Sequence, residues 1–143
     1  MTEDEFDLGR FLPYALSQAA EATSMGFQKF YRQRYGMLRT EWRVLFHLGR
    51  YGEMTAKEIC ERASLHKTKV SRAVHALEAK RFLSRMPQKQ DRRLETLSLT
   101  RQGVAVYDDL YETARSYDAA LARHFTEQER EVLRHCLEKL VNL

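Results

Sequence analysis

The hydrophobic pattern of this chain changes its period between residues 82 and 99. Two short runs rich in strand-forming residues, 82–86 and 94–99, flank a polar and charged segment at 87–92. Such a pair of runs around a turn-forming segment predicts a β-hairpin. Helices are expected elsewhere, because only two prolines and six glycines occur in 143 residues. The sequence therefore predicts a mainly α protein with one small β-hairpin.

Four helices are expected before the hairpin and two after it, in the order α-α-α-α-β-β-α-α, with room for a very short strand near Met54. The first helix is predicted over residues 7–35, because apolar side chains recur there at helical spacing. Pro13 marks either the start of this helix or a kink in it. Gly36 is a good stop signal at its end.

Capping residues and glycines delimit the other helices. The second helix is expected over 41–48, with Thr40 as its N-cap and with Gly49 and Gly52 at its end. After the hairpin a helix restarts at once, and a capping box at 126–129 opens the last helix.

A short helix and a longer one precede the hairpin and have the dimensions of a helix-turn-helix. A capping box at 55–58 opens the short helix, 56–63, and a tight turn leads to the longer helix, 67–80. In this motif the second helix keeps an apolar inner face and offers polar side chains to DNA bases. The inner face consists of Val70, Val74 and Leu77. The candidates for contact with the major groove are Lys67, Thr68, Lys69, Ser71, Arg72 and His75.

Basic residues are concentrated around these elements. Residues 54–103 hold 12 Lys and Arg against 5 Asp and Glu, whereas residues 1–53 are balanced and residues 104–143 are acidic. Such a distribution is typical of a nucleic-acid-binding surface, although a solvated basic face gives the same count. The charge pattern and the helix-turn-helix together favour double-stranded DNA as the partner.

The hairpin offers a second contact with DNA, because Lys89, Arg92 and Arg93 lie at or beside its tip. An arginine on a thin β-ribbon can enter the narrow minor groove, where the negative potential is enhanced. Asp91 would repel phosphate if it were unpaired. We therefore interpret Asp91 as the carboxylate that orients Arg93, two residues on and on the same face of a strand.

The run from Asp91 to Gly103, Asp-Arg-Arg-Leu-Glu-Thr-Leu-Ser-Leu-Thr-Arg-Gln-Gly, resembles the Asp-x-Arg…Leu-x-Leu-Thr-x-x-Gly signature of MarR/SlyA-type winged helix-turn-helix regulators. The stretch from Lys67 to Glu78 resembles the recognition helix of that family, and the resemblance covers the whole chain. One departure is Lys80-Arg81, where many members carry a glycine before the first wing strand.

The resemblance implies a single MarR-like domain over 1–143, with a DNA-binding lobe at 38–100 and a helical dimerisation region at 7–35 and 101–143. It also implies a homodimer that binds a pseudo-palindromic operator, usually as a repressor. An apolar stripe on the two C-terminal helices independently favours a second copy, because no further layer of the chain is expected to cover it. An intramolecular helical layer is the alternative.

Members of the family commonly respond to small aromatic acids, phenols or oxidants, so the resemblance implies an effector. The candidate pocket residues are Tyr31, Trp42, Phe46, His47 and Tyr107, and core packing is the alternative that helical spacing of aromatic residues favours for each of them. The alternative of a redox-responsive regulator depends on Cys60 or Cys136. Both are expected in apolar positions without a cationic neighbour, where a thiol is a poor nucleophile.

The sequence contains no glycine-rich phosphate loop, catalytic triad or histidine pair at metal spacing, so no enzyme, metal or cofactor is expected. No apolar run approaches the roughly 20 residues that span a bilayer, and the acidic N-terminus is unlike a signal peptide. A cytoplasmic protein is therefore expected. A winged helix that binds protein instead of DNA remains an alternative, against which the outward basic side chains of 67–80 argue.

Overall fold

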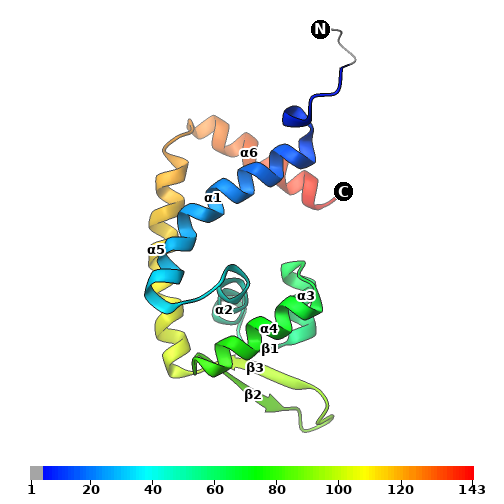
Figure 1. The fold of residues 1–143 in the computed structure, drawn as a ribbon, viewed down its shortest axis with the longest axis vertical. Helices are drawn as coiled ribbons and strands as arrows, with labels where there is room; N and C mark the ends of the chain where they lie inside the picture. The colour runs from blue at the N-terminus through cyan, green and yellow to red at the C-terminus, as the bar shows by residue number, and fades with distance from the viewer. Residues whose placement is uncertain (1–4) are drawn as a thin grey trace. The chain divides into compact units, whose positions relative to one another are not determined.

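The computed structural model of the chain describes residues 5–143, which form helices and one three-stranded antiparallel sheet (Figure 1). The elements, in chain order, are η1 (Leu8–Arg10), α1 (Leu12–Tyr35), α2 (Arg39–Tyr51), β1 (Met54–Thr55), α3 (Ala56–Ala63), α4 (Lys67–Ala79), β2 (Leu83–Pro87), β3 (Glu95–Leu99), α5 (Arg101–Ala122) and α6 (Glu127–Val141). The predicted winged helix-turn-helix fold is confirmed, and β1 is the short strand expected near Met54.

The chain falls into two compact units, one ending at Tyr107 and the other covering Asp108–Leu143. The boundary lies inside α5. The first unit holds α1 to α4, the sheet and the first turns of α5, so it contains the whole of the expected DNA-binding lobe, 38–100. The second unit consists of the remainder of α5 and α6.

Pro13 determines where α1 begins. The sequence predicts one helix over 7–35, but the chain first forms η1. The helical conformation is then interrupted at Phe11, whose ψ of 118° is extended. Pro13 then occupies the first turn of α1, where its missing N–H removes no helical hydrogen bond. The end of the helix is as predicted, since Gly36 takes a φ of 63° and its N–H donates to the Arg32 carbonyl at 2.9 Å.

The first turn of α2 differs from the prediction. Leu38, not Thr40, is the N-cap, and its backbone N–H donates to Oε2 of Glu41 at 3.3 Å. Glu41 is only 4% exposed, and its Oε1 accepts a hydrogen bond from Nζ of Lys80 at 3.3 Å. This buried carboxylate therefore ties the start of α2 to the residue that caps α4.

The prediction that Gly49 ends α2 is wrong, because the helix continues to Tyr51 and stops at Gly52. A Cβ atom at Gly49 would overlap the ring of Tyr107, in the first turns of α5. Glycine at this position permits two helices to approach closely, and it is not a turn signal.

Helix α4 packs through the residues predicted for its inner face, and α3 packs against it. Val70, Val74 and Leu77 are at most 2% exposed, and Ile59 of α3 is completely buried. The Thr55 hydroxyl accepts a hydrogen bond from the Glu58 N–H at 3.2 Å, as expected of the capping residue of α3.

The sheet has the order β1-β3-β2, so β3 lies in the middle. Leu83 pairs with Leu99, and Met54 pairs with Leu97. Leu83 and Leu97 are each 2% exposed, which anchors the root of the hairpin in the core of the first unit. Both hairpin strands begin one residue later than predicted.

Thr100 and Gly103 join the hairpin to α5. The Thr100 hydroxyl donates to the Arg81 carbonyl at 2.6 Å and accepts a hydrogen bond from the Gly103 N–H at 3.0 Å. The Thr100 N–H donates to the Phe82 carbonyl at 3.0 Å, and a Cβ atom at Gly103 would overlap that same carbonyl. The Thr-x-x-Gly part of the signature thus fixes the start of α5 against the turn that precedes the wing.

The second unit confirms the capping box predicted for α6. The Thr126 hydroxyl accepts the Glu129 N–H at 3.1 Å, and the Glu129 carboxylate accepts the Thr126 N–H at 2.9 Å. Side chains on the apolar face of α6 are exposed in the single chain, with Val132 at 56%, Leu133 at 45% and Leu137 at 42%. Across residues 5–143, none of the helices combines the length and apolar character that crossing a membrane requires.

Candidate DNA-binding surface

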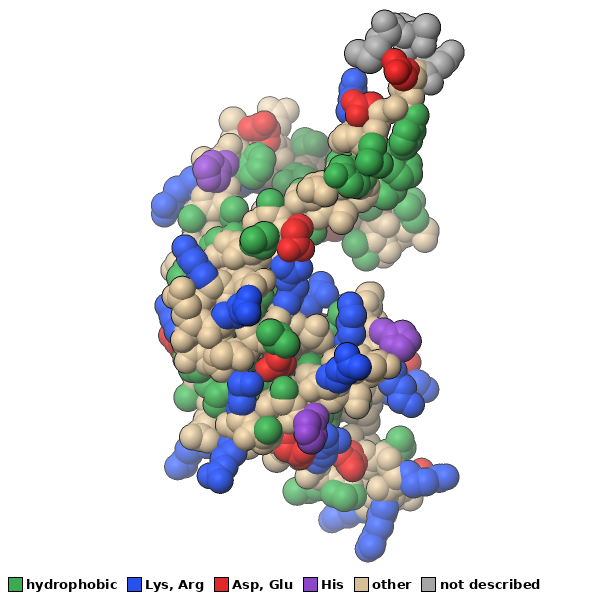
Figure 2. Space-filling view, in the orientation of Figure 1, with side chains coloured by type: hydrophobic (Ala, Val, Ile, Leu, Met, Phe, Trp, Pro, Cys, Tyr) green, Lys and Arg blue, Asp and Glu red, His purple; other side chains and the backbone are tan. Residues whose placement is uncertain are grey.

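Helix α4 separates its side chains into a buried face and an exposed face. The six residues predicted to contact the major groove, Lys67, Thr68, Lys69, Ser71, Arg72 and His75, are all exposed. They lie opposite the buried stripe of Val70, Val74 and Leu77. Figure 2 shows Lys and Arg side chains gathered over the hairpin and the helices beside it. The arrangement offers polar side chains and positive charge from the N-terminal half of α4.

His66 has a structural role that the sequence did not predict. It is the N-cap of α4, and its Nδ1 accepts a hydrogen bond from the Thr68 N–H at 3.2 Å. An acceptor at this position satisfies one of the backbone N–H groups that the first turn of a helix leaves unpaired, so His66 stabilises the start of α4. His75 is exposed farther along the helix.

The wing is the hairpin formed by β2, β3 and the turn between them. At the tip of the wing, Arg93 is hydrogen-bonded to Asp91. Oδ1 of Asp91 accepts hydrogen bonds from the backbone N–H of Arg93 at 3.0 Å and from its Nε at 3.2 Å. These hydrogen bonds, the one from the side chain foremost, hold the pKa of Asp91 below its usual value. The Arg93 side chain is 91% exposed, and Lys89 and Arg92 at the same tip are also exposed.

The expected contact between Asp91 and Arg93 is present, but its predicted geometry was wrong. The two residues lie in the turn before β3 and do not share the face of a strand. Asp91 contacts Arg93 because its side chain bonds to the backbone two residues ahead, as short acidic side chains do in turns.

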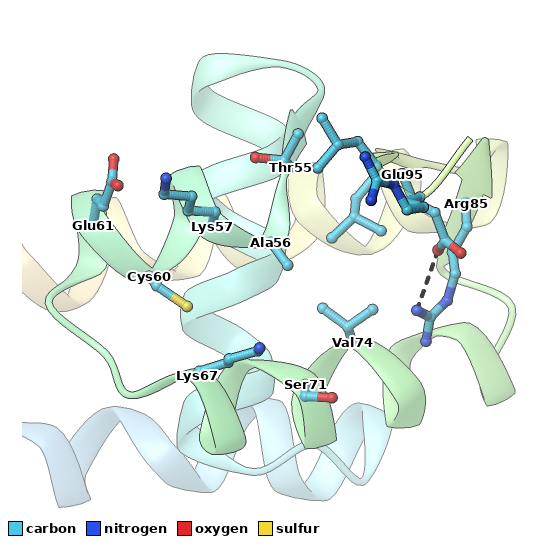
Figure 3. A pocket seen from close by; sticks show the side chains of 13 residues that line it. Thr55, Ala56, Lys57, Cys60, Glu61, Lys67, Ser71, Val74, Arg85 and Glu95 are labelled. Carbon is cyan, nitrogen blue, oxygen red and sulfur yellow. Dashed lines mark hydrogen bonds and ion pairs between the residues drawn. The ribbon is translucent and has the colours of Figure 1, made fainter. Parts of the chain in front are cut away.

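A hollow of about 670 Å³ lies between α3, α4 and the wing. Its lining includes Lys57 and Cys60 of α3, Lys67 and Ser71 of α4, and Arg93 of the wing. Figure 3 shows Cys60 and Lys67 reaching into it from the two helices. Basic and hydroxyl side chains from three elements therefore converge on one concave surface.

Comparisons with known proteins agree with this geometry. A model of the MarR family matches residues 35–94. The homoprotocatechuate degradative operon repressor of Escherichia coli is 24% identical over 132 residues, which cover 92% of this chain and 88% of the repressor. A MarR/EmrR family transcriptional regulator from Acinetobacter sp. ADP1 is 26% identical, and its crystal structure superposes with a TM-score of 0.85 over 96% of both chains. The chain is therefore similar to MarR-family regulators, in sequence over residues 35–94 and in fold.

The same fold occurs in a protein of lower sequence identity. Bordetella bronchiseptica BpsR, whose DNA binding is regulated by 6-hydroxynicotinic acid, is 17% identical, with a TM-score of 0.87 over 97% of this chain and 99% of BpsR. At this identity the likeness concerns the fold alone.

Four of the five residues expected in the effector pocket form a continuous aromatic row. The ring centroids of Tyr31 and Trp42 are 5.8 Å apart, those of Trp42 and Phe46 are 4.9 Å apart, and those of Phe46 and Tyr107 are 5.0 Å apart. Nε1 of Trp42 is buried without a hydrogen-bond partner among the described residues. His47 is not part of this row, and its Nδ1 lies 2.6 Å from the carbonyl oxygen of Arg43.

The structure corrects the expected burial of both cysteines. Cys60 is only partly buried and lines the hollow beside Lys67, and Cys136 is exposed in the single chain. The small residues of α3 thus face an open surface as well as the core, which the helical pattern of α3 alone did not distinguish.

Proposed function

We propose that this protein is a transcriptional repressor that reads its operator in the major groove with α4 and contacts the adjacent minor groove with the wing. The observation that carries the proposal is the exposure of all six candidate contact residues of α4 opposite its buried stripe. Lysine and arginine suit guanine or phosphate, and serine and threonine suit base edges or phosphate. The description of the E. coli relative as a repressor supports the direction of regulation.

The hollow provides a path for the DNA backbone. If α4 lies in the major groove and Arg93 enters the minor groove, the sugar-phosphate strand between the grooves crosses the space between α4 and the wing. Lys57, Lys67 and Ser71 line that space and can contact phosphates. Asp91 keeps the Arg93 guanidinium extended at the tip, so this contact needs little ordering on binding.

We expect the protein to act as a homodimer in the cytoplasm, where its operator lies. Each unit exposes large apolar side chains in the single chain, among them Phe6 at 70% and Leu8 at 52% in the first unit and Leu133 at 45% in the second. Exposed apolar surface of this kind marks an interface. A two-fold dimer would present two α4 helices to half-sites about 10 bp apart, and so would select a pseudo-palindrome.

A small aromatic acid is the effector class that we propose for the aromatic row. Trp42 offers a buried N–H without a partner, and the aromatic faces around it suit a planar ring. The E. coli relative takes its name from an operon that degrades homoprotocatechuate, and BpsR responds to 6-hydroxynicotinic acid. Both compounds combine an aromatic ring with a carboxylate.

Selection of duplexes from a random-sequence pool tests the proposed function. The wild-type protein should recover a pseudo-palindromic motif. Ser71→Ala and Arg72→Ala should each relax the preference at particular positions, because a good side-chain contact to a base discriminates by about 1–3 kcal/mol. Lys139→Ala, at an exposed basic residue of α6, should leave the motif unchanged. Failure to enrich any sequence would favour a winged helix that binds protein.

A further inference from the structure

Arg85, in the middle of β2, bonds to carboxylates on two other elements. Its Nε donates to Oε2 of Glu78 in the last turn of α4 at 3.1 Å, and its Nη1 donates to Oε2 of Glu95 in β3 at 3.3 Å. Figure 3 shows the bond between Arg85 and Glu95 at the edge of the hollow. A single guanidinium therefore connects the recognition helix to both strands of the wing.

The register of the hairpin explains why Arg85 reaches both partners. Arg85 pairs with Leu97, and Pro87 pairs with Glu95, so Arg85 and Glu95 are diagonal neighbours on one face. Leu83, two residues before Arg85, shares this face and is buried. The face of the hairpin that carries Arg85 is thus the face turned towards the core of the first unit.

We propose that Arg85 is a positioning residue, which together with Glu78 and Glu95 forms a clamp that fixes the outer half of the wing relative to α4. The proposal rests on the proposed function, because the clamp would set the spacing between the major-groove and minor-groove contacts. Leu83 and Leu97 anchor the root of the hairpin, whereas Pro87, farther along the same face, is exposed, so the outer half has left the core.

The guanidinium is the group that this role requires. Its planar fork can donate to two carboxylates in fixed directions, whereas an ammonium acts as a single point charge. The Arg85 side chain is 35% exposed, against 91% for Arg93 at the tip. Arg93 therefore projects into solvent at the tip, whereas Arg85 is directed back towards the protein.

The clamp predicts an effect opposite to that of simple electrostatics. Removing a negative charge near phosphates should strengthen DNA binding. Glu78→Gln and Glu95→Gln are instead expected to weaken it about two- to fivefold, which corresponds to an exposed ion pair. Glu61→Gln is the matched control, because Glu61 also lines the hollow but lies outside the clamp. This control should bind DNA more tightly.

Two further variants separate positioning from direct contact. Arg85→Lys keeps the charge but cannot bond to both carboxylates as a fork, so we expect a loss of about two- to fivefold. A direct phosphate contact by Arg85 would leave this variant close to the wild-type affinity. Glu78→Gln should also have no added effect in an Arg93→Ala background, because the clamp acts through the tip.

Fluorescence anisotropy at fixed salt, with the duplex recovered by the wild-type protein, measures these affinities. Thermal unfolding followed by circular dichroism checks that each variant is folded. Weaker binding by Glu78→Gln and Glu95→Gln, with tighter binding by Glu61→Gln, supports the clamp. Tighter binding by Glu78→Gln, or an effect additive with Arg93→Ala, overturns the clamp while leaving the proposed function intact. If the wild-type protein recovers no duplex, both proposals fail.

Discussion

Arg81 has a backbone conformation that side chains disfavour. Its φ of 67° lies in the left-handed region, at the position where the sequence lacks the glycine found in many members of the family. Arg81→Gly should therefore raise the free energy of unfolding by about 0.5–1 kcal/mol, measured by chemical denaturation. Ala79→Gly, two residues earlier in the last turn of α4, is the control and should lower it by a similar amount. Equal effects of the two variants would contradict this account.

His66 caps α4 through Nδ1, which accepts a hydrogen bond from the Thr68 N–H at 3.2 Å. His66→Ala removes this acceptor and should lower the free energy of unfolding by about 0.5–2 kcal/mol, whereas His66→Asn keeps a capping oxygen and should stay close to the wild type. Chemical denaturation compares the two variants, and equal stability would show that the cap contributes nothing.

Asp91 should not make the affinity for DNA depend on pH in the range where binding is measured. Its hydrogen bonds with Arg93 lower its pKa from the ordinary value of 3.8, so the bonded form is fully present above that value. The contact is lost only as the pH falls through the lowered pKa, well below the range used for DNA binding.

The junction between the wing and α5 depends on a glycine that no side chain can replace. A Cβ atom at Gly103 would overlap the Phe82 carbonyl, so Gly103→Ala should force the hairpin and α5 apart. A loss of about 1–3 kcal/mol in the free energy of unfolding is expected from such overpacking. Gln102→Ala, exposed in the same turn, should change stability little. Denaturant midpoints compare the two variants. If Gly103→Ala unfolds at the wild-type midpoint, the junction tolerates a side chain at this position.

Elements with local signals could be predicted from the sequence. The Thr55 and Thr126 caps, the Gly36 stop and the buried stripe of α4 depend on residues within a few positions of one another. Gly49 could not be interpreted correctly, because its partner Tyr107 is distant in the sequence and a close approach gives the same glycine as a helix end.

In the candidate site, too, features with local sequence signals could be predicted, and features that depend on distant residues could not. The exposed polar side chains of α4 follow from helical periodicity, and the Asp91–Arg93 contact follows from the two-residue spacing, although through a turn. The bonds of Arg85 depend on the register that pairs Arg85 with Leu97. Sequence alone does not fix that register, so the two carboxylate partners of Arg85 could not be predicted from it.

At the scale of the whole molecule, a charge placed on the apolar face of α6 tests whether a second copy of the chain covers that face. Leu133→Arg places a charge on a face that is already exposed in the single chain, so the fold should persist while the dimer dissociates. Sedimentation should detect a monomer, and DNA affinity should fall because the two half-sites are no longer bound together. Gln128→Arg, in the first turn of α6, adds the same charge and should remain dimeric. A dimeric Leu133→Arg would exclude this face from the interface.

The bonds at Thr100 make the start of α5 a short rigid lever. One end is fastened to the Arg81 and Phe82 carbonyls at the root of the wing, and the other carries Tyr107, 5.0 Å from Phe46 in the aromatic row. A ligand that displaced Tyr107 would therefore turn the root of the wing as well. Amide exchange at Thr100 and Gly103, with and without an aromatic acid, would measure that motion. Ligand binding at the aromatic row and a change at the root of the wing would then be parts of one rigid-body motion of the start of α5.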